Sequence, residues 1–164
     1  ANRVMLYKTA KYSIEAPMLI GAAFAGSSAT ARHSLSSFAI PLGLAFQLRD
    51  DVLGVYGDPK VTGKPAGDDL REGKRTVLVA LTRQVLEGKI GEMFEQMLTA
   101  NDIGPDQIAV MQQTIIGTGA LKKVETLIKE LGDEALIALA GLPISASAKD
   151  GFDQLARAVM NRES

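Results

Sequence analysis

Residues 46–76 read FQLRDDVLGVYGDPKVTGKPAGDDLREGKRT, which predicts one helix, a loop rich in glycine and proline, and the start of a second helix. Gln47, Asp50 and Asp51 are three and four residues apart, so they share one face of the first helix. Two adjacent ionised carboxylates repel each other, and a divalent cation would remove that repulsion. Magnesium takes one or two protein carboxylates and fills its other positions with water and phosphate oxygens. We therefore expect Mg²⁺ at Asp50 and Asp51.

Two lysines of the same stretch, Lys64 and Lys74, are expected to contact the phosphate. A nucleotide-binding loop of the form GxxxxGK[ST] is an alternative interpretation of this region. It does not fit, because five residues instead of four separate Gly57 from Gly63, and because Pro65 stands where a Ser or Thr would reach the metal. Lysine would act here as a mobile point charge.

The stretch resembles the second aspartate-rich motif and the following loop of the trans-type isoprenyl diphosphate synthases. The matching positions are Gln47, Asp50, Asp51, Gly57, Asp58, Thr62, Gly63, Lys64, Pro65, Asp69, Leu70, Glu72, Gly73, Lys74, Arg75 and Thr76. The motif usually carries a third aspartate four residues after the first, and this chain has Gly54 there. One metal contact is therefore expected to be missing or supplied by water.

The resemblance implies that Asp50 and Asp51 hold Mg²⁺. It implies catalytic roles for Lys8, Thr9, Gln47 and Lys64. These four residues and Lys74 would bind or orient the diphosphate of an allylic substrate. The implied activity is metal-assisted loss of diphosphate, followed by condensation with isopentenyl diphosphate to a longer polyprenyl diphosphate such as geranylgeranyl diphosphate. A homodimer and a cytoplasmic location are also implied.

In the family, a Lys-Thr pair lies at a helix break opposite the second aspartate motif, and YKTAKYS around Lys8 and Thr9 fits that context. The resemblance covers residues 1–164 as the C-terminal part of a single polyprenyl synthetase domain. The first DDxxD motif and a GKR-type segment for isopentenyl diphosphate are not found in the sequence. We expect the isolated 164-residue chain to be inactive.

Three other functions compete with this interpretation. A terpene cyclase shares the fold, but its second motif usually reads as an Asn/Ser/Glu triad and the GKP…EGKRT loop is absent from it. A non-catalytic partner subunit of a heteromeric prenyltransferase is supported by Gly54 and opposed by the intact aspartates and lysines. A helical interaction domain would leave the Asp/Lys pattern unexplained.

Composition favours an all-α protein and excludes several classes of site. Hydrophobic residues make up 46% of the chain but aromatic residues only 5%, so the core is built mainly from Ala, Leu, Ile and Val at helical spacing. The net charge of −1 gives no bulk attraction to nucleic acid. The absence of cysteine excludes disulfides and Cys-ligated metal sites. The run 16–29 is too short and too rich in Gly and Ser to span a bilayer, and the N-terminus does not read as a signal peptide.

Apolar periodicity, caps and breakers predict antiparallel helices joined by short loops. The predicted helices are 2–12, a second piece to residue 25 capped by Ser13, 30–55 with a kink or break at Pro41, 73–86, 90–100, 105–117, 120–140, and a last helix capped by Ser145 or Ser147. Residues 57–67 are predicted as loop.

Several conspicuous residues are interpreted as structural. Asp68 and Asp69 follow Gly67 and are expected to cap a helix. Arg75, predicted at a helix start, is expected to form a structural ion pair. His33 has no second histidine, so it is not part of a metal cluster. Three methionines at helical spacings are expected to fill the core, namely Met93, Met97 and Met111.

Overall fold

The computed structural model describes residues 2–100 and 102–161, and these residues form helices and connecting segments without any strand. The predicted all-α class is confirmed. The chain divides into two compact units. Of the described residues, 2–49 and 127–161 form the terminal unit, and 50–100 and 102–126 form the central unit. Two long helices, α3 (Ala29–Tyr56) and α9 (Ala120–Ala140), contribute residues to both units.

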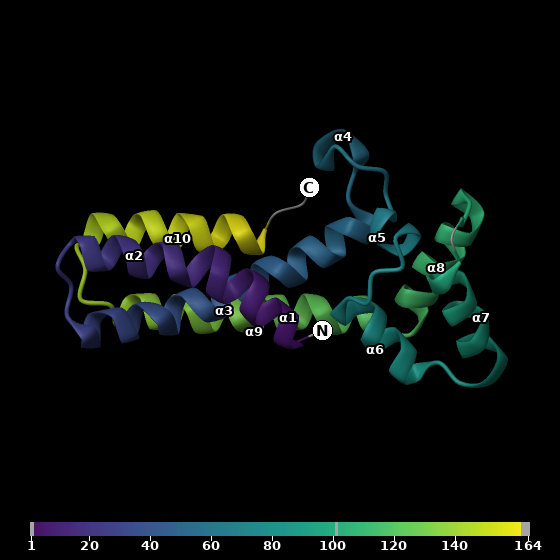
Figure 1. The fold of residues 1–164 in the computed structure, drawn as a ribbon, viewed down its shortest axis with the longest axis horizontal. Helices are drawn as coiled ribbons and strands as arrows, with labels where there is room; N and C mark the ends of the chain where they lie inside the picture. Colours follow the sequence, from purple (N-terminus) through teal and green to yellow (C-terminus); the bar gives the residue numbers. More distant parts are fainter. Residues whose placement is uncertain (1, 101, 162–164) are drawn as a thin grey trace. The chain divides into compact units, whose positions relative to one another are not determined.

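The terminal unit begins with a continuous run of helix and ends with the last helix of the chain (Figure 1). The continuous run consists of α1 (Asn2–Val4), η1 (Met5–Glu15) and α2 (Ala16–Phe24), and the last helix is α10 (Ala146–Met160). The core is shared by α3, α9 and α10, with side chains of α2 packed against it. The buried members are Leu35, Phe38, Leu42, Ala135, Leu139, Leu142, Ala156 and Val159. Spacings of three, four and seven residues along α3 and α9 place these side chains on one face.

An aromatic pair closes one part of this core. The rings of Phe38 and Phe152 lie edge to face with their centroids 5.4 Å apart. This arrangement contributes about 0.5–1.5 kcal/mol beyond the area that the rings bury. Leu155, on the same helix as Phe152, is 47% exposed and lies outside this core.

The central unit is built around α8 (Pro105–Gly117), which contacts α5 (Asp68–Arg71), α6 (Val77–Val85) and α7 (Gly88–Thr99). Buried side chains of these helices include Leu70, Leu78, Val79, Phe94, Leu98, Ile108, Met111 and Ile115. Met111 therefore fills the core as predicted. Met93 does not, because it is 58% exposed and lines an open hollow of about 480 Å³ together with Met97 and Val110.

Local capping explains where several helices begin. Pro105 takes the first turn of α8, and the side chain of Gln107 accepts a hydrogen bond from the backbone N–H of Gly104 at 2.8 Å. Ser145 caps α10 by accepting from the N–H of Ala148 at 3.2 Å. The predicted bounds of α8 and α9 and the cap of α10 are confirmed.

Other predicted boundaries are wrong. The chain does not restart at Ser13, because helical geometry runs without interruption from residue 2 to residue 24. Of the kink or break predicted at Pro41, the break does not occur, because α3 runs through this residue as one helix. Within the predicted loop, Asp58 caps a single turn of helix, α4 (Pro59–Thr62). The helix predicted from residue 73 begins at Val77, because Thr76 caps it.

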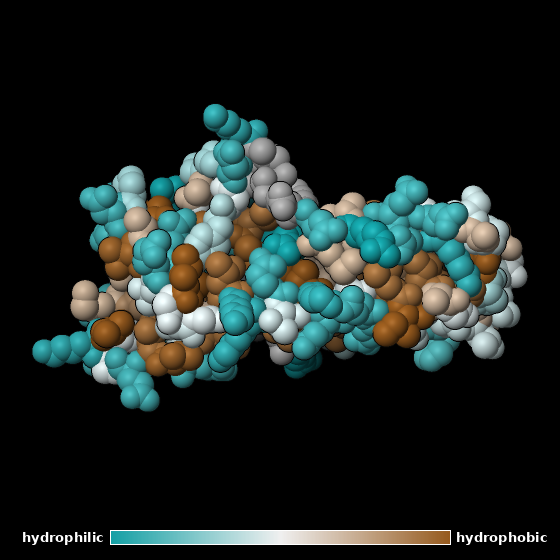
Figure 2. Space-filling model, turned by 180° about the vertical axis from the view of Figure 1, so that it is seen from behind, coloured by the Kyte–Doolittle hydropathy of each residue, from teal (hydrophilic) through white to brown (hydrophobic). Residues whose placement is uncertain are grey.

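The surface carries both polar and apolar side chains, and Figure 2 shows brown apolar patches among teal hydrophilic ones on the face that it presents. Among the side chains that the structure describes, the large hydrophobic ones with the greatest exposure are Phe24 and Tyr12 of the terminal unit. Among the helices of the described residues, none combines the length and the hydropathy that crossing a lipid bilayer requires.

Candidate functional site

Lys8 and Thr9 lie in a wide helical segment at the start of the terminal unit. From Met5 to Glu15 the chain is π-helical, and at its end the backbone N–H of Ala16 donates to the carbonyl of Lys11, five residues earlier. π-Helical turns are rare in proteins and are frequently found at functional sites. The sequence predicts a helix break at Lys8 and Thr9, and the structure instead widens the helix there without breaking it.

Thr9 is hydrogen-bonded to Gln47, and the family resemblance assigns both residues to one site. The Thr9 hydroxyl donates to Oε1 of Gln47 at 2.5 Å, which joins η1 to α3 within the terminal unit. Thr9 is only 7% exposed, whereas the side chain of Lys8 is exposed. The structure therefore brings together two of the predicted residues that are 38 positions apart in the sequence.

Asp50 and Asp51 are adjacent on α3, in the part of this helix that belongs to the central unit. Asp51 is 6% exposed and Asp50 is exposed. Within the part of the chain that the structure describes, no group of three or more Asp, Glu or His side chains could hold a metal ion. The site offers two adjacent carboxylates, and magnesium needs no more than one or two from the protein.

Gly54 replaces the third aspartate of the motif, and its surroundings show what has changed there. A Cβ atom at residue 54 would overlap the carboxylate of Asp69, which lies against this turn of α3. Both residues belong to the central unit. The space beside Gly54 is therefore occupied by a carboxylate that comes from α5 and not from α3.

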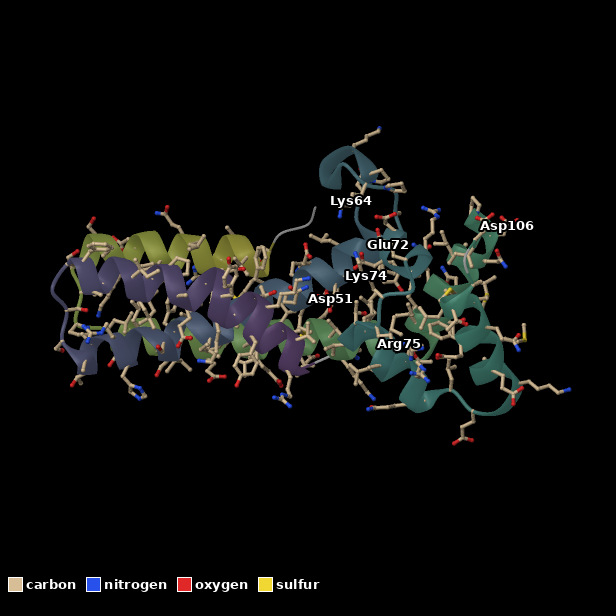
Figure 3. All side chains as sticks on the ribbon, viewed as in Figure 1. Asp51, Lys64, Glu72, Lys74, Arg75 and Asp106 are labelled. Carbon is tan, nitrogen blue, oxygen red and sulfur yellow. The ribbon has the colours of Figure 1, made fainter. Side chains whose placement is uncertain are left out.

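Lys64 lies on the exposed loop that follows α4, in the central unit (Figure 3). Two local features shape this loop. The N-cap Asp58 accepts a hydrogen bond from the N–H of Lys60 at 2.9 Å, and Gly63 ends α4 with a φ of +70°. A left-handed residue of this kind is usually glycine, because it has no Cβ to clash. The side chain of Thr62, one of the matching motif positions, lies outside the described residues.

Lys74 lies in the segment between α5 and α6 and forms two ion pairs (Figure 3). Its ammonium is 2.5 Å from Oδ1 of Asp69 and 2.9 Å from Oε2 of Glu72. The hydrogen bond to Asp69, followed by that to Glu72, raises the pKa of Lys74 above its ordinary value. The hydrogen bond from Lys74 likewise holds the pKa of Glu72 below its ordinary value. These two carboxylates thus stabilise the protonated form of Lys74.

Asp69 and Glu72 are functional candidates that the sequence interpretation missed. The sequence places Asp69 as a cap, but the N-cap of α5 is Gly67, and the Asp69 side chain reaches Lys74. Gly73 makes this possible, because its φ of +63° turns the chain back after α5. The signal that could have shown the pair is the Asp-x₄-Lys spacing with a glycine just before the lysine. Asp68 pairs with Arg71 at 3.8 Å.

Arg75 has the structural role that the sequence predicts. Its guanidinium is 2.7 Å from Oε1 of Glu95 in α7, and Arg83 of α6 reaches the other oxygen of the same carboxylate at 2.7 Å. Glu95 therefore ties the segment before α6, and α6 itself, to α7.

Comparisons with known proteins agree on one family. The family described as polyprenyl synthetase matches residues 2–115. A geranylfarnesyl diphosphate synthase from Aeropyrum pernix is 34% identical over 150 residues, which are 91% of this chain and 46% of that protein. A geranylgeranyl diphosphate synthase from Sulfolobus acidocaldarius is 46% identical over 66 residues, 40% of this chain and 20% of that protein.

Solved structures give the same result. A geranylgeranyl pyrophosphate synthase from Corynebacterium glutamicum, complexed with isoprenyl diphosphate and magnesium, is 40% identical with a TM-score of 0.92, covering 97% of this chain and 45% of that one. A polyprenyl synthase from Caulobacter crescentus, complexed with calcium and isoprenyl diphosphate, is 31% identical with a TM-score of 0.84, covering 98% and 48%. The chain thus spans about half the length of these relatives. The comparisons do not favour a cyclase or a silent partner subunit.

Proposed function

The chain belongs to the polyprenyl synthetase family, and on that premise we propose that the whole protein is a prenyltransferase. It condenses an allylic diphosphate with isopentenyl diphosphate and releases a longer polyprenyl diphosphate, of geranylgeranyl length or similar. The observation that carries this proposal is the placement of Gln47, Asp50 and Asp51 within five residues of α3, with Asp51 buried. Residues 1–164 form the C-terminal part of the synthetase domain in this proposal.

Asp50 and Asp51 would hold Mg²⁺. The donor set fits this ion, because carboxylate oxygens are hard ligands and the remaining positions can be filled by water and by the substrate's phosphate oxygens. When bound, magnesium would act as a Lewis acid that stabilises the charge developing on the departing diphosphate. The two residues differ in exposure, since Asp50 is exposed and Asp51 is buried.

Thr9 and Gln47 would orient the allylic diphosphate through one shared proton. A threonine hydroxyl has a single proton to donate, and in the structure Gln47 accepts it. If the Gln47 side chain presents its NH₂ group to Thr9 instead, the hydroxyl proton becomes available to a diphosphate oxygen. Rotation of the Gln47 amide would therefore free the Thr9 hydroxyl to donate to the ligand.

Lys8, Lys64 and Lys74 would supply positive charge to the diphosphate. Lys8 and Lys64 are exposed, and a lysine ammonium is a compact charge on a flexible stem. Lys74 is also paired with Asp69 and Glu72. Its contact with a diphosphate requires it to share its donors between these carboxylates and the phosphate, and an ammonium has three donors.

We further propose that the protein works as a cytoplasmic homodimer, as the family resemblance implies. It acts on small diphosphates and not on nucleic acid, in keeping with its net charge of −1.

The proposed activity is tested by assaying the product of the complete open reading frame with geranyl or farnesyl diphosphate, isopentenyl diphosphate and Mg²⁺. We expect Mg²⁺-dependent chain elongation, detected by mass spectrometry. Asp51→Asn should lower kcat/KM at least about 100-fold, since loss of metal binding removes several kcal/mol of transition-state stabilisation. Asp106→Asn, an exposed aspartate in the first turn of α8, is the matched control and should leave the rate unchanged. Absence of elongation, or equal rates for the two variants, would contradict the proposal.

A further inference from the structure

Gly43 lies on α3 one turn before Gln47, and it is buried against η1 within the terminal unit. A Cβ atom at residue 43 would lie 2.5 Å from Cα of Ala10, 2.9 Å from Cβ of Ala10 and 3.2 Å from Cγ1 of Ile14. The nearest of these atoms belongs to the backbone, so it cannot rotate aside as a long side chain could. The two helices approach this closely only because residue 43 has no side chain.

This close approach lies beside the Thr9–Gln47 hydrogen bond. Residues four apart on a helix share a face, so residues 43 and 47 of α3 both face η1. On η1 their partners, Ala10 and Thr9, are consecutive, and both are buried. The contact between residues 43 and 10 therefore determines how closely the helices approach at the position where the Thr9 hydroxyl meets Gln47.

The distances show how much the hydrogen bond depends on this contact. Carbon atoms that are not bonded to each other sit best at about 3.5–4.0 Å. A methyl group at residue 43 would therefore push Cα of Ala10 away by about 1 Å. The same displacement would lengthen the hydrogen bond from Thr9, now 2.5 Å, to about 3.5 Å, beyond the range of an O–H···O bond. Residue 43 is thus linked to Thr9 without touching it.

We propose that Gly43 is a positioning residue, which seats the π-helix against α3 and thereby holds the Thr9 hydroxyl on Gln47. The inference rests on the proposed function to the extent that Thr9 and Gln47 bind the diphosphate. Glycine destabilises a helix interior relative to alanine, so a glycine at this position is a disadvantage for α3 by itself. The close packing of η1 against α3 at residue 43 compensates for that disadvantage.

The first test is a double-mutant cycle on stability, which needs no activity. Thr9→Val is introduced into the wild-type chain and into Gly43→Ala, and the denaturant midpoint is measured for all four proteins. We expect Thr9→Val to lower the midpoint in the wild type, and to lower it by less than half as much when residue 43 is alanine. Gly21→Ala is the matched control, because Gly21 is a helical residue of the same unit with open surroundings. If Thr9→Val lowers the denaturant midpoint equally in the wild type and in Gly43→Ala, the inference is overturned.

The second test uses the protein made from the complete open reading frame and measures its Mg²⁺-dependent binding of inorganic pyrophosphate by calorimetry. Gly43→Ala should weaken binding about tenfold, as Thr9→Val does, and the two changes together should weaken it no further. Gly21→Ala should bind like the wild type. Normal binding by Gly43→Ala would overturn the inference. If the wild-type protein made from the complete open reading frame binds no pyrophosphate, the proposed function is contradicted instead, and the stability cycle then decides the role of Gly43 alone.

One measurement keeps the inference testable if Gly43→Ala does not fold. In the wild-type chain, the Hα protons of Gly43 should show nuclear Overhauser effects to the methyl group of Ala10, because the two residues are in direct contact. Their absence would show that η1 does not sit on α3 in this way.

Discussion

The carboxylate of Asp69 lies against the backbone of Gly54 and occupies the space that a side chain at residue 54 would need. The same carboxylate holds Lys74 at 2.5 Å. One position of the aspartate motif is therefore linked sterically to a lysine that is 20 residues away in the sequence, with Asp69 between them.

Gly54→Ala should not give the stability that alanine normally brings to a helix. An ordinary Gly→Ala change in a helix interior gains about 0.5–1 kcal/mol. At residue 54 the methyl group must displace Asp69 from Lys74, so we expect no gain or a net loss in the free energy of unfolding, measured by urea denaturation. Gly117→Ala, in α8 of the same unit with open surroundings, is the control and should not be destabilised. A full gain at residue 54 would refute the steric link.

Asp69→Asn should lower the pKa of Lys74 toward its ordinary value, since the hydrogen bond to Asp69 is the largest cause of its rise. The loss of stability should stay below about 1 kcal/mol, because the ammonium is partly exposed. NMR titration of the Lys74 ammonium measures the pKa directly. Asp68→Asn, which alters the pair with Arg71 instead, should leave the pKa of Lys74 unchanged. An unchanged pKa in Asp69→Asn would be the contrary result.

Tyr56→Phe should change how stability depends on alkaline pH. Burial raises the pKa of Tyr56 to about 12 from its ordinary value of 10.0. The folded state thus keeps the phenol proton where the unfolded state has lost it, so stability falls as the pH rises from 10 to 12. With allowance for the partial exposure of this ring, the fall is about 1 kcal/mol. Denaturation at pH 9 and pH 11.5 should show a steeper loss in the wild type than in Tyr56→Phe; parallel losses would contradict the argument.

Truncation to alanine should affect the free energy of unfolding very differently at two phenylalanines of the terminal unit. Phe38 is 0% exposed and packs on Phe152, so Phe38→Ala should cost about 3–5 kcal/mol through lost burial and a residual cavity. Phe24 is 90% exposed, so Phe24→Ala should change the free energy of unfolding by less than about 0.5 kcal/mol. Chemical denaturation of the two variants provides the comparison. Similar losses would show that Phe38 is not in the core of the folded chain.

Local chemistry made part of this fold predictable. Pro105 and Ser145 fix the starts of α8 and α10 by interactions within a few residues, and the structure confirms both starts. The family resemblance likewise depended on residues that are close in sequence. Where a single nearby residue decides the outcome, the sequence suffices.

The remaining features depend on contacts between distant residues. The π-helix is one of these, because its sequence contains ordinary helix formers, and Ala10 within it packs closely on Gly43, 33 positions later. The pairing of Asp69 is another, since the acidic pair beside Gly67 is equally typical of a cap. Residue periodicity gives neither the spacing between two helices nor the choice between two partners.

The end of α3 shows the same dependence on distant residues. The side chain of Gln112 donates to the carbonyl of Val55 at 2.6 Å, and its own backbone carbonyl accepts from the hydroxyl of Tyr56 at 2.8 Å. The last carbonyls of a helix have no partner within it. During synthesis on a ribosome, the final turn of α3 therefore cannot form these hydrogen bonds until Gln112 has been added to the chain. The polypeptide must be extended by more than 50 residues beyond the motif before that turn reaches its native hydrogen bonding.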